Sequence, residues 1–135
     1  AVIYKDAGAA MKTLSHDIGS FEIVKDTILS SLGESDRTKR VILACEEIFV
    51  NIVHYAGADQ ISFGSKRIGD TWLVTYIDNG IAFDPVKAER KDLEFEKLDQ
   101  GGMGIMAARM NSREMIYNRI DGRNVLTMVF DADDI

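Results

Sequence analysis

Three stretches of the sequence combine residue types that could carry out chemistry, and the first begins at Asp78. The segment before it is β-branched and aromatic, which predicts a buried strand that ends in this carboxylate. The run from Asp78 to Gly80 would also suit a hairpin turn, because glycine adopts a positive φ without strain. A hairpin needs a second strand directly after its turn, whereas the run from Phe83 to Pro85 opens a long charged segment. This order favours a nucleotide pocket with a lid.

The second stretch places Glu47, Asn51 and His54 on one face of an expected helix, at positions i, i+4 and i+7. An exposed polar stripe is the commoner explanation of such spacing. Asparagine, however, is a poor helix former that competes for backbone hydrogen bonds, and here it stands within a strongly apolar run. An asparagine one turn after a glutamate would suit a site that needs an oxygen ligand and a carboxylate.

The third stretch is the glycine cluster made by Gly101, Gly102, Met103 and Gly104. A flexible linker followed by the start of a helix would explain it. Alternatively, consecutive backbone N–H groups and a helix N-terminus would cradle phosphate. The connection from Asn79 to Gly102 is far longer than the usual loop of about 4–6 residues, and the charged stretch 84–100 within it is expected to be a lid that orders over a nucleotide.

The composition bounds the class of protein. At 135 residues and 46% apolar, the chain predicts one domain with a hydrophobic core, at residues 10–131, preceded by an N-terminal extension at 1–9. The net charge of −6, without a Lys/Arg cluster, argues against a nucleic-acid partner. No apolar run approaches the roughly 20 residues that span a bilayer, and no signal peptide is evident, so we expect a cytoplasmic protein without a membrane partner. The histidines lack zinc-site spacing, so any metal is expected to be Mg²⁺ that accompanies phosphate.

Hydrophobic periodicity and turn residues predict the elements that position these motifs. We expect an edge strand at Ala10–Ser15, helices at Asp17–Leu32 and Arg37–Tyr55, strands at Gln60–Ile68 and Thr71–Ile77, a helix from near Met103, and strands at Glu114–Ile120 and Val125–Phe130. The last two strands would form a hairpin that turns over residues 121–124. Helices and hairpins in this order predict an α+β fold, a two-layer α/β sandwich whose mixed, mostly antiparallel sheet has helices on one face.

Taken in order, the three motifs resemble those of the ATPase superfamily that contains gyrase, the heat-shock chaperone and the histidine kinases. Glu47-x-x-x-Asn51 resembles its N box, Asp78-x-Gly80 with Phe83-Asp84-Pro85 its first glycine box, and Gly101-Gly102-Met103-Gly104 its second. The size of the chain and the stretch from Tyr117 to Met128 are closer to one branch, the anti-sigma-factor serine/threonine kinases. The resemblance covers residues 10–131 and implies the Bergerat-type ATP-binding fold.

The resemblance also implies a role for each matching residue, with ATP and Mg²⁺ as cofactors. Asp78 would accept a hydrogen bond from the adenine amino group with support from Thr127, and Gly80 would let the adenine approach closely. Asn51 would hold Mg²⁺ against the phosphates, and Glu47 would be the general base for the attacking hydroxyl. The nucleotide-binding set is completed by Phe83, Gly101, Gly102, Met103 and Gly104, of which the three glycines would wrap the phosphates.

The function implied by the resemblance is phosphorylation of Ser/Thr on an antagonist protein (an anti-anti-sigma protein) by an anti-sigma factor in a partner-switching pathway. The antagonist and a sigma factor would then be the partners. A second hypothesis is a nucleotide-gated binding module that sequesters a sigma factor or another partner with little or no kinase activity. A third is an α+β domain whose glycines serve only turns. An edge strand near residues 10–15 would also allow a homodimer.

Overall fold

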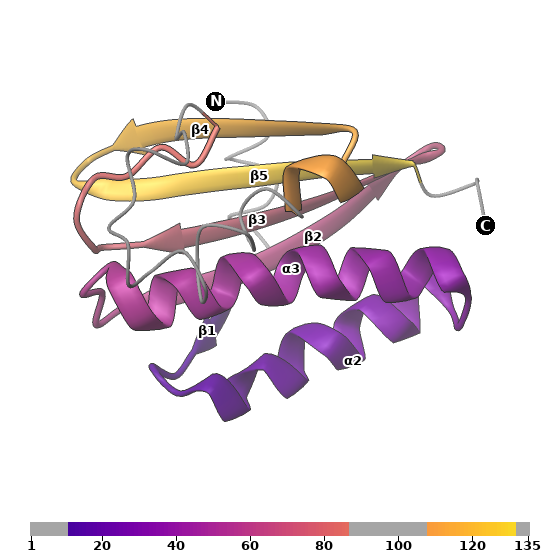
Figure 1. Cartoon of the computed structure of the whole chain (residues 1–135), viewed down its shortest axis with the longest axis horizontal. Coiled ribbons are helices and arrows are strands. Elements are labelled where there is room, and N and C mark those ends of the chain that lie inside the picture. The colour runs from indigo at the N-terminus through magenta and orange to yellow at the C-terminus, as the bar shows by residue number, and fades with distance from the viewer. Residues whose placement is uncertain (1–10, 87–107, 132–135) are drawn as a thin grey trace.

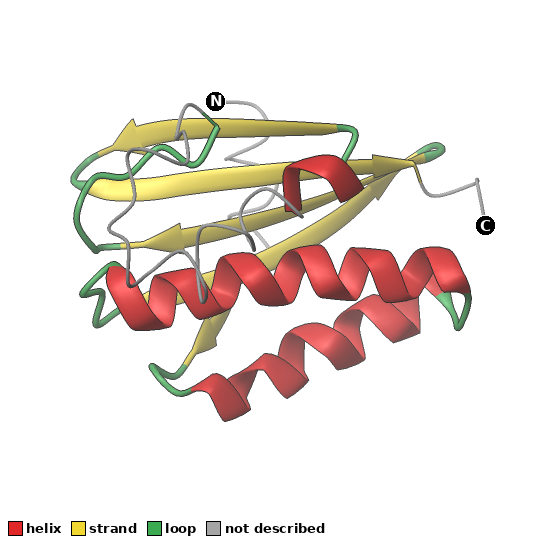
Figure 2. Ribbon diagram, in the orientation of Figure 1, coloured by secondary structure: helices red, strands yellow, loops and turns green. Residues whose placement is uncertain are grey.

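Within the part of the chain that the structure describes, residues 11–86 and 108–131, five strands form one sheet and the helices α2 and α3 cover one of its faces (Figures 1 and 2). This structure is a computed structural model. Its elements are β1 (Lys12–Leu14), the short 3-10 helix η1 (Ile18–Ser20), α2 (Phe21–Leu32), α3 (Asp36–Tyr55), β2 (Ile61–Ile68), β3 (Thr71–Asp78), β4 (Glu114–Ile120) and β5 (Arg123–Asp131). Residues 108–111 are also helical. No helix of these described ranges is long and apolar enough to cross a membrane.

The central strand β3 sets the positions of the site residues. The sheet has the order β1-β2-β3-β5-β4, so that β3 lies between β2 and β5. The register places Asp78, the last residue of β3, opposite Asn124 of β5. Because side chains alternate along a strand, Trp72 and Tyr76 point to the same face as Asp78. These two aromatic side chains belong to the hydrophobic core with the helices, so Asp78 lies on the helix-covered face.

The helix α3 carries the second sequence motif and has a well-defined start. The hydroxyl of Ser35 accepts a hydrogen bond from the backbone N–H of Thr38 at 3.0 Å, which satisfies one of the free donors of the first turn. The side chains that α3 buries recur at three- and four-residue steps: Val41, Ala44, Cys45, Ile48, Phe49 and Ile52. This apolar face fixes the rotation of α3, and therefore the direction in which its polar residues point.

A buried hydrogen bond joins α3 to the centre of the sheet. The hydroxyl of Tyr76 on β3 donates to the backbone carbonyl of Cys45 at 2.8 Å, and the Tyr76 ring lies beside those of Phe49 and Phe63. Burial also raises the pKa of the Cys45 thiol far above its ordinary value, so the thiol stays protonated and unreactive. Since α3 cannot slide along β3 without breaking the Tyr76 bond, the two elements hold their site residues in a fixed relation.

The predicted α+β architecture with helices on one face is confirmed, although every described strand pairing is antiparallel rather than mixed. The edge strand is shorter than predicted, and the helix expected from Asp17 begins with a 3-10 turn. The helix expected from near Met103 begins outside the described residues. The hairpin alternative for the run from Asp78 to Gly80 is wrong, because β3 pairs with β2 and β5 and not with the segment that follows it.

One boundary differs in a way that changes the site. The sequence predicted a turn over residues 121–124, whereas the observed turn consists of Asp121 and Gly122, which have positive φ values of 52° and 75°. Two consecutive positive φ values are those of a type I′ turn, whose twist matches that of the flanking strands. As a result β5 begins at Arg123, and Asn124 becomes a strand residue directly opposite Asp78.

Candidate functional site

The carboxylate of Asp78 is buried at the end of β3, with 4% of the residue exposed. One of its oxygens, Oδ1, accepts two hydrogen bonds, from the backbone N–H of Gly80 at 2.9 Å and from Nδ2 of Asn124 at 3.0 Å. Among the described residues, no donor contacts the second oxygen, Oδ2. The carboxylate is therefore fixed by one oxygen and keeps the other as an acceptor for a ligand.

Asn124 is the residue that sequence reasoning missed, and it is the most connected side chain of the site. Its Nδ2 donates to Asp78 and to the carbonyl of Ile81, and its Oδ1 accepts from the Phe83 N–H, the Tyr117 hydroxyl and Nη1 of Arg119. Arg119 also donates from Nη1 to the carbonyl of Gly80 at 2.9 Å. The loop after β3 is thus tied to β4 and β5 through one buried amide. The sequence prediction missed it because it began the last strand at Val125 and gave no pairing of that strand with the one that ends at Asp78.

The predicted support of Asp78 by Thr127 needs correction. Thr127 lies three residues beyond Asn124 on β5, and side chains alternate along a strand, so it points to the opposite face of the sheet. There its hydroxyl is buried and hydrogen-bonded to the hydroxyl of Thr75 at 2.8 Å. The structure brings Asn124, and not Thr127, to Asp78.

Gly80 is required by the packing of the protein itself. A Cβ at this position would lie 2.4 Å from the carbonyl oxygen of Ala56, the C-cap of α3. The same carbonyl accepts a hydrogen bond from the N–H of Ile81 at 2.9 Å. The space that a Cβ would need is occupied by the end of α3. This contact joins the Asp78 motif to the helix that carries the Glu47 motif. The role of Gly80 in letting adenine approach, which the resemblance implied, stays a prediction.

Glu47 and Asn51 are brought together on α3 as the sequence predicted. Nδ2 of Asn51 donates to the backbone carbonyl of Glu47 at 2.7 Å, which leaves the Asn51 carbonyl oxygen Oδ1 as the group available to a ligand. Both residues are half-buried at the border of the apolar face, whereas His54 is exposed and lies beside the ring of Tyr55. The structure therefore assembles the glutamate and the asparagine and leaves the histidine at the surface.

The electrostatic environment of Glu47 favours proton uptake. Partial burial raises the pKa of its carboxyl above the ordinary value, and the negative charge of the neighbouring Glu46 raises it further. Among the described residues, the Glu47 carboxylate has no hydrogen bond or ion pair. A raised pKa and an uncommitted carboxylate are the properties that a general base requires.

Only some of the remaining predicted site residues belong to the described part of the chain. Phe83 belongs to the loop after β3, where its N–H donates to Asn124 and the residue is 37% exposed. The large apolar side chains of Ile81 and Val86 in the same loop are also exposed. The glycine cluster at residues 101–104 lies outside the described residues, as does nearly all of the predicted lid.

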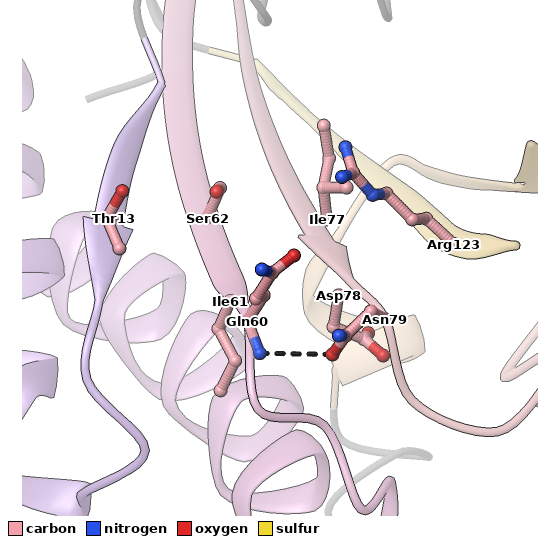
Figure 3. Close-up of a pocket in the computed structure, with 8 residues that line it drawn as sticks. All are labelled: Thr13, Gln60, Ile61, Ser62, Ile77, Asp78, Asn79 and Arg123. Atoms are coloured by element: carbon pink, nitrogen blue, oxygen red, sulfur yellow. Dashed lines mark hydrogen bonds between the residues drawn. The ribbon is translucent and has the colours of Figure 1, made fainter. Parts of the chain in front are cut away.

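A hollow of about 240 Å³ lies beside the same end of β3 but opens on the other face of the sheet (Figure 3). It is lined by Thr13, Gln60, Ile61, Ser62, Ile77, Asp78, Asn79 and Arg123. Oδ1 of Asn79 accepts from the backbone N–H of Gln60 at 3.0 Å, so the middle residue of the Asp-Asn-Gly run serves to attach β3 to the start of β2. Glu47 and Asn51 do not line this hollow, which is therefore not the place where the motifs meet.

The comparisons with known proteins agree with this geometry. Residues 22–130 match the family described as histidine kinase-like ATPase domain. The chain belongs to this family. Among solved structures, the histidine kinase AdeS of Acinetobacter baumannii is similar, with a TM-score of 0.54 and 13% sequence identity over 92% of this chain and 68% of that chain. At this identity the likeness shows the fold alone. No curated protein matches the chain.

Histidine kinase-like ATPase domains bind ATP, normally with Mg²⁺, and the described residues suit these ligands. Asp78 keeps a carboxylate oxygen that can accept from an amino group. Asn51 keeps an amide oxygen, which is a ligand type that Mg²⁺ prefers. The phosphate-wrapping role of Gly101, Gly102 and Gly104 stays a prediction, because these residues lie outside the described ranges.

The packing of Gly80 predicts that Gly80→Ala destabilises the domain. The new Cβ would also lie 2.7 Å from the Cβ of Ala56, so the loop or the end of α3 must move. We expect the free energy of unfolding to fall by about 1–3 kcal/mol in urea denaturation. Gly19→Ala is the control, because a Cβ at Gly19 would meet only ordinary contacts, the nearest at 3.6 Å. Equal stability of the two variants would contradict the packing explanation.

The environment of Glu47 predicts a pH-dependent effect of Glu47→Gln. Because the pKa of Glu47 is raised in the folded state, folding favours the protonated carboxyl. The stability that this preference contributes is lost as the pH rises through the folded pKa. The glutamine variant carries no charge at any pH, so it should be more stable than the parent at pH 7 and lose that advantage below about pH 4. Urea denaturation of both proteins at the two pH values measures the difference. A stability difference that does not change with pH would show that Glu47 is not perturbed.

Proposed function

We propose that this domain binds ATP with Mg²⁺ and transfers the γ-phosphate to a serine or threonine of an antagonist protein, as an anti-sigma-factor kinase does. The main support for this proposal is the arrangement of Glu47 and Asn51 on α3. Asn51 presents an amide oxygen because its Nδ2 is bound to the backbone of Glu47. One turn away, Glu47 presents a carboxylate that has no partner among the described residues and whose pKa is raised. A metal ligand beside a proton acceptor is the arrangement that phosphoryl transfer to a hydroxyl needs.

In this proposal Asp78 recognises adenine, because its Oδ2 accepts a hydrogen bond from the exocyclic amino group. Asn124 takes the supporting role that the resemblance implied for Thr127. Asn51 is the ligand of Mg²⁺, and Glu47 is the general base. Phe83 and the glycine cluster at 101–104 complete the nucleotide site on the strength of the family membership. The partners are the antagonist protein and a sigma factor. A homodimer through the edge strand β1 stays a prediction.

The competing proposal keeps the same nucleotide site but assigns it a gating role, in which nucleotide binding controls the capture of a sigma factor or another partner without phosphotransfer. The exposed apolar side chains of Ile81, Phe83 and Val86, next to the site, favour this possibility because they give a partner apolar surface close to the nucleotide. The two proposals differ only in whether phosphate is transferred.

Asp78→Asn should remove most of the affinity for ATP and ADP without unfolding the domain. The amide replaces an acceptor by a donor opposite the adenine amino group, and a buried donor left without a partner costs about 1–3 kcal/mol, or roughly 5- to 150-fold in affinity. Isothermal titration with ATP and Mg²⁺ measures this, with Asp70→Asn in the exposed β2–β3 turn as the control. Parental affinity in Asp78→Asn would refute the assignment of the base site.

Glu47→Ala should leave nucleotide affinity nearly intact and slow phosphotransfer by about 10²–10⁴-fold, because a general base acts mainly in the transition state. Asn51→Ala should instead weaken the Mg²⁺-dependent part of ATP binding, because it removes a metal ligand. The measurement is single-turnover transfer of labelled phosphate to antagonist-type proteins of the source cell, beside an ATP titration for each variant. Parental transfer rates in Glu47→Ala would exclude it as the base. ATP binding without any transfer by the parent would favour the gated module.

A further inference from the structure

We propose that Asn124 determines the base selectivity of the nucleotide site by holding the Asp78 carboxylate in one orientation. This inference rests on the proposed ATP binding and assigns a residue that neither the motifs nor the family match identify. Asn124 is 6% exposed and lies directly opposite Asp78 in the β3–β5 register. It is a positioning residue, since it acts on the base through Asp78.

The first step concerns the orientation of the carboxylate. Oδ1 of Asp78 accepts from the N–H of Gly80 and from Nδ2 of Asn124, and these two donors approach from the loop and from β5. A carboxylate with two donors on the same oxygen cannot rotate without losing both bonds. Its Oδ2 is therefore held as an acceptor, which suits the amino group of a 6-aminopurine and opposes the carbonyl of a 6-oxopurine.

The second step concerns what holds Asn124 itself. Its amide orientation is assigned by its neighbours, because Oδ1 accepts from the Phe83 N–H, the Tyr117 hydroxyl and Arg119, all of which are donors. With Oδ1 occupied in this way, Nδ2 must face Asp78 and the Ile81 carbonyl. A flipped amide would set Oδ1 against two acceptors, and Nδ2 against the Phe83 N–H and the Arg119 guanidinium, which can only donate. The base selectivity thus depends on the Asn124 side chain, whose orientation is fixed by its hydrogen-bond partners.

The decisive variant is Asn124→Asp, which is isosteric and keeps an oxygen for the donors from Phe83, Tyr117 and Arg119. It changes the group that faces Asp78 and the Ile81 carbonyl, and two carboxylate oxygens would now meet at the 3.0 Å separation of the present hydrogen bond between Asn124 and Asp78. Two carboxylates at such a distance repel each other unless they share a proton. Asn124→Ala is less informative, because it removes all five hydrogen bonds and tests folding as much as binding.

The test compares the binding of ATP with that of ITP, whose base carries a carbonyl in place of the amino group. For Asn124→Asp at pH 8, we expect ATP affinity to fall by roughly 10-fold or more, while ITP affinity changes much less because ITP does not use the Asp78 acceptor. The preference of the parent for ATP should therefore shrink. A merely structural role would lower the affinity for both nucleotides equally.

The ATP affinity of Asn124→Asp should also recover as the pH falls and the two carboxylates share a proton, whereas the parent should show no such recovery. Arg119 and Tyr117 of β4 are the other titratable groups in contact with this position.

Thr127→Val is the matched control. It removes a buried hydrogen bond from the same strand on the opposite face, so it should lower stability while keeping the ATP-to-ITP affinity ratio of the parent. The inference would be overturned if Asn124→Asp folds and keeps the parental ATP-to-ITP affinity ratio while Asp78→Asn has lost the preference for ATP. The proposed function would still stand. A parent that binds neither nucleotide would overturn the proposed function and this inference with it.

Discussion

The cross-strand contact between Asp78 and Asn124 is the constraint on which the rest of the site depends. It closes the end of the central strand pair, where β3 finishes and β5 begins. From Asn124, hydrogen bonds reach the loop after β3 and the side chains that project from β4. The loop in turn lies so close to Ala56 that only glycine fits at position 80. Sheet, loop and α3 are therefore fixed relative to one another by a few short polar contacts around one buried amide.

The helix α3 shows how a core element can also supply polar groups. Its apolar face is set into the core, and Tyr76 adds a hydrogen bond to its backbone at Cys45. Glu47 and Asn51 lie at the border of that face, where partial burial perturbs a carboxyl without the full cost of burying a charge. A more exposed position would leave Glu47 with ordinary acidity, and a more buried one would require a partner for it.

Local signals were sufficient to predict most of the fold and part of the site. The placement of Glu47 and Asn51 on one face of a helix follows from helix geometry alone and was predicted correctly. Asn124 could not be found in this way. It lies in a run rich in turn-forming residues, and its place in β5 depends on a two-residue turn and on long-range pairing with β3. The sequence likewise marks position 80 as one that needs glycine, but only the packed structure shows that Ala56 is the reason.

The buried thiol of Cys45 has a practical consequence for experiments on this domain. It is the single cysteine of the chain, and it lies in the core, where the thiolate that reacts with maleimides and disulfides is strongly disfavoured. The native protein therefore offers a nearly silent background for thiol chemistry. A cysteine introduced at an exposed position such as Val86, in the loop after β3, would take up a fluorophore or spin label selectively. The environment of the site could then be followed by spectroscopy without first removing a core residue.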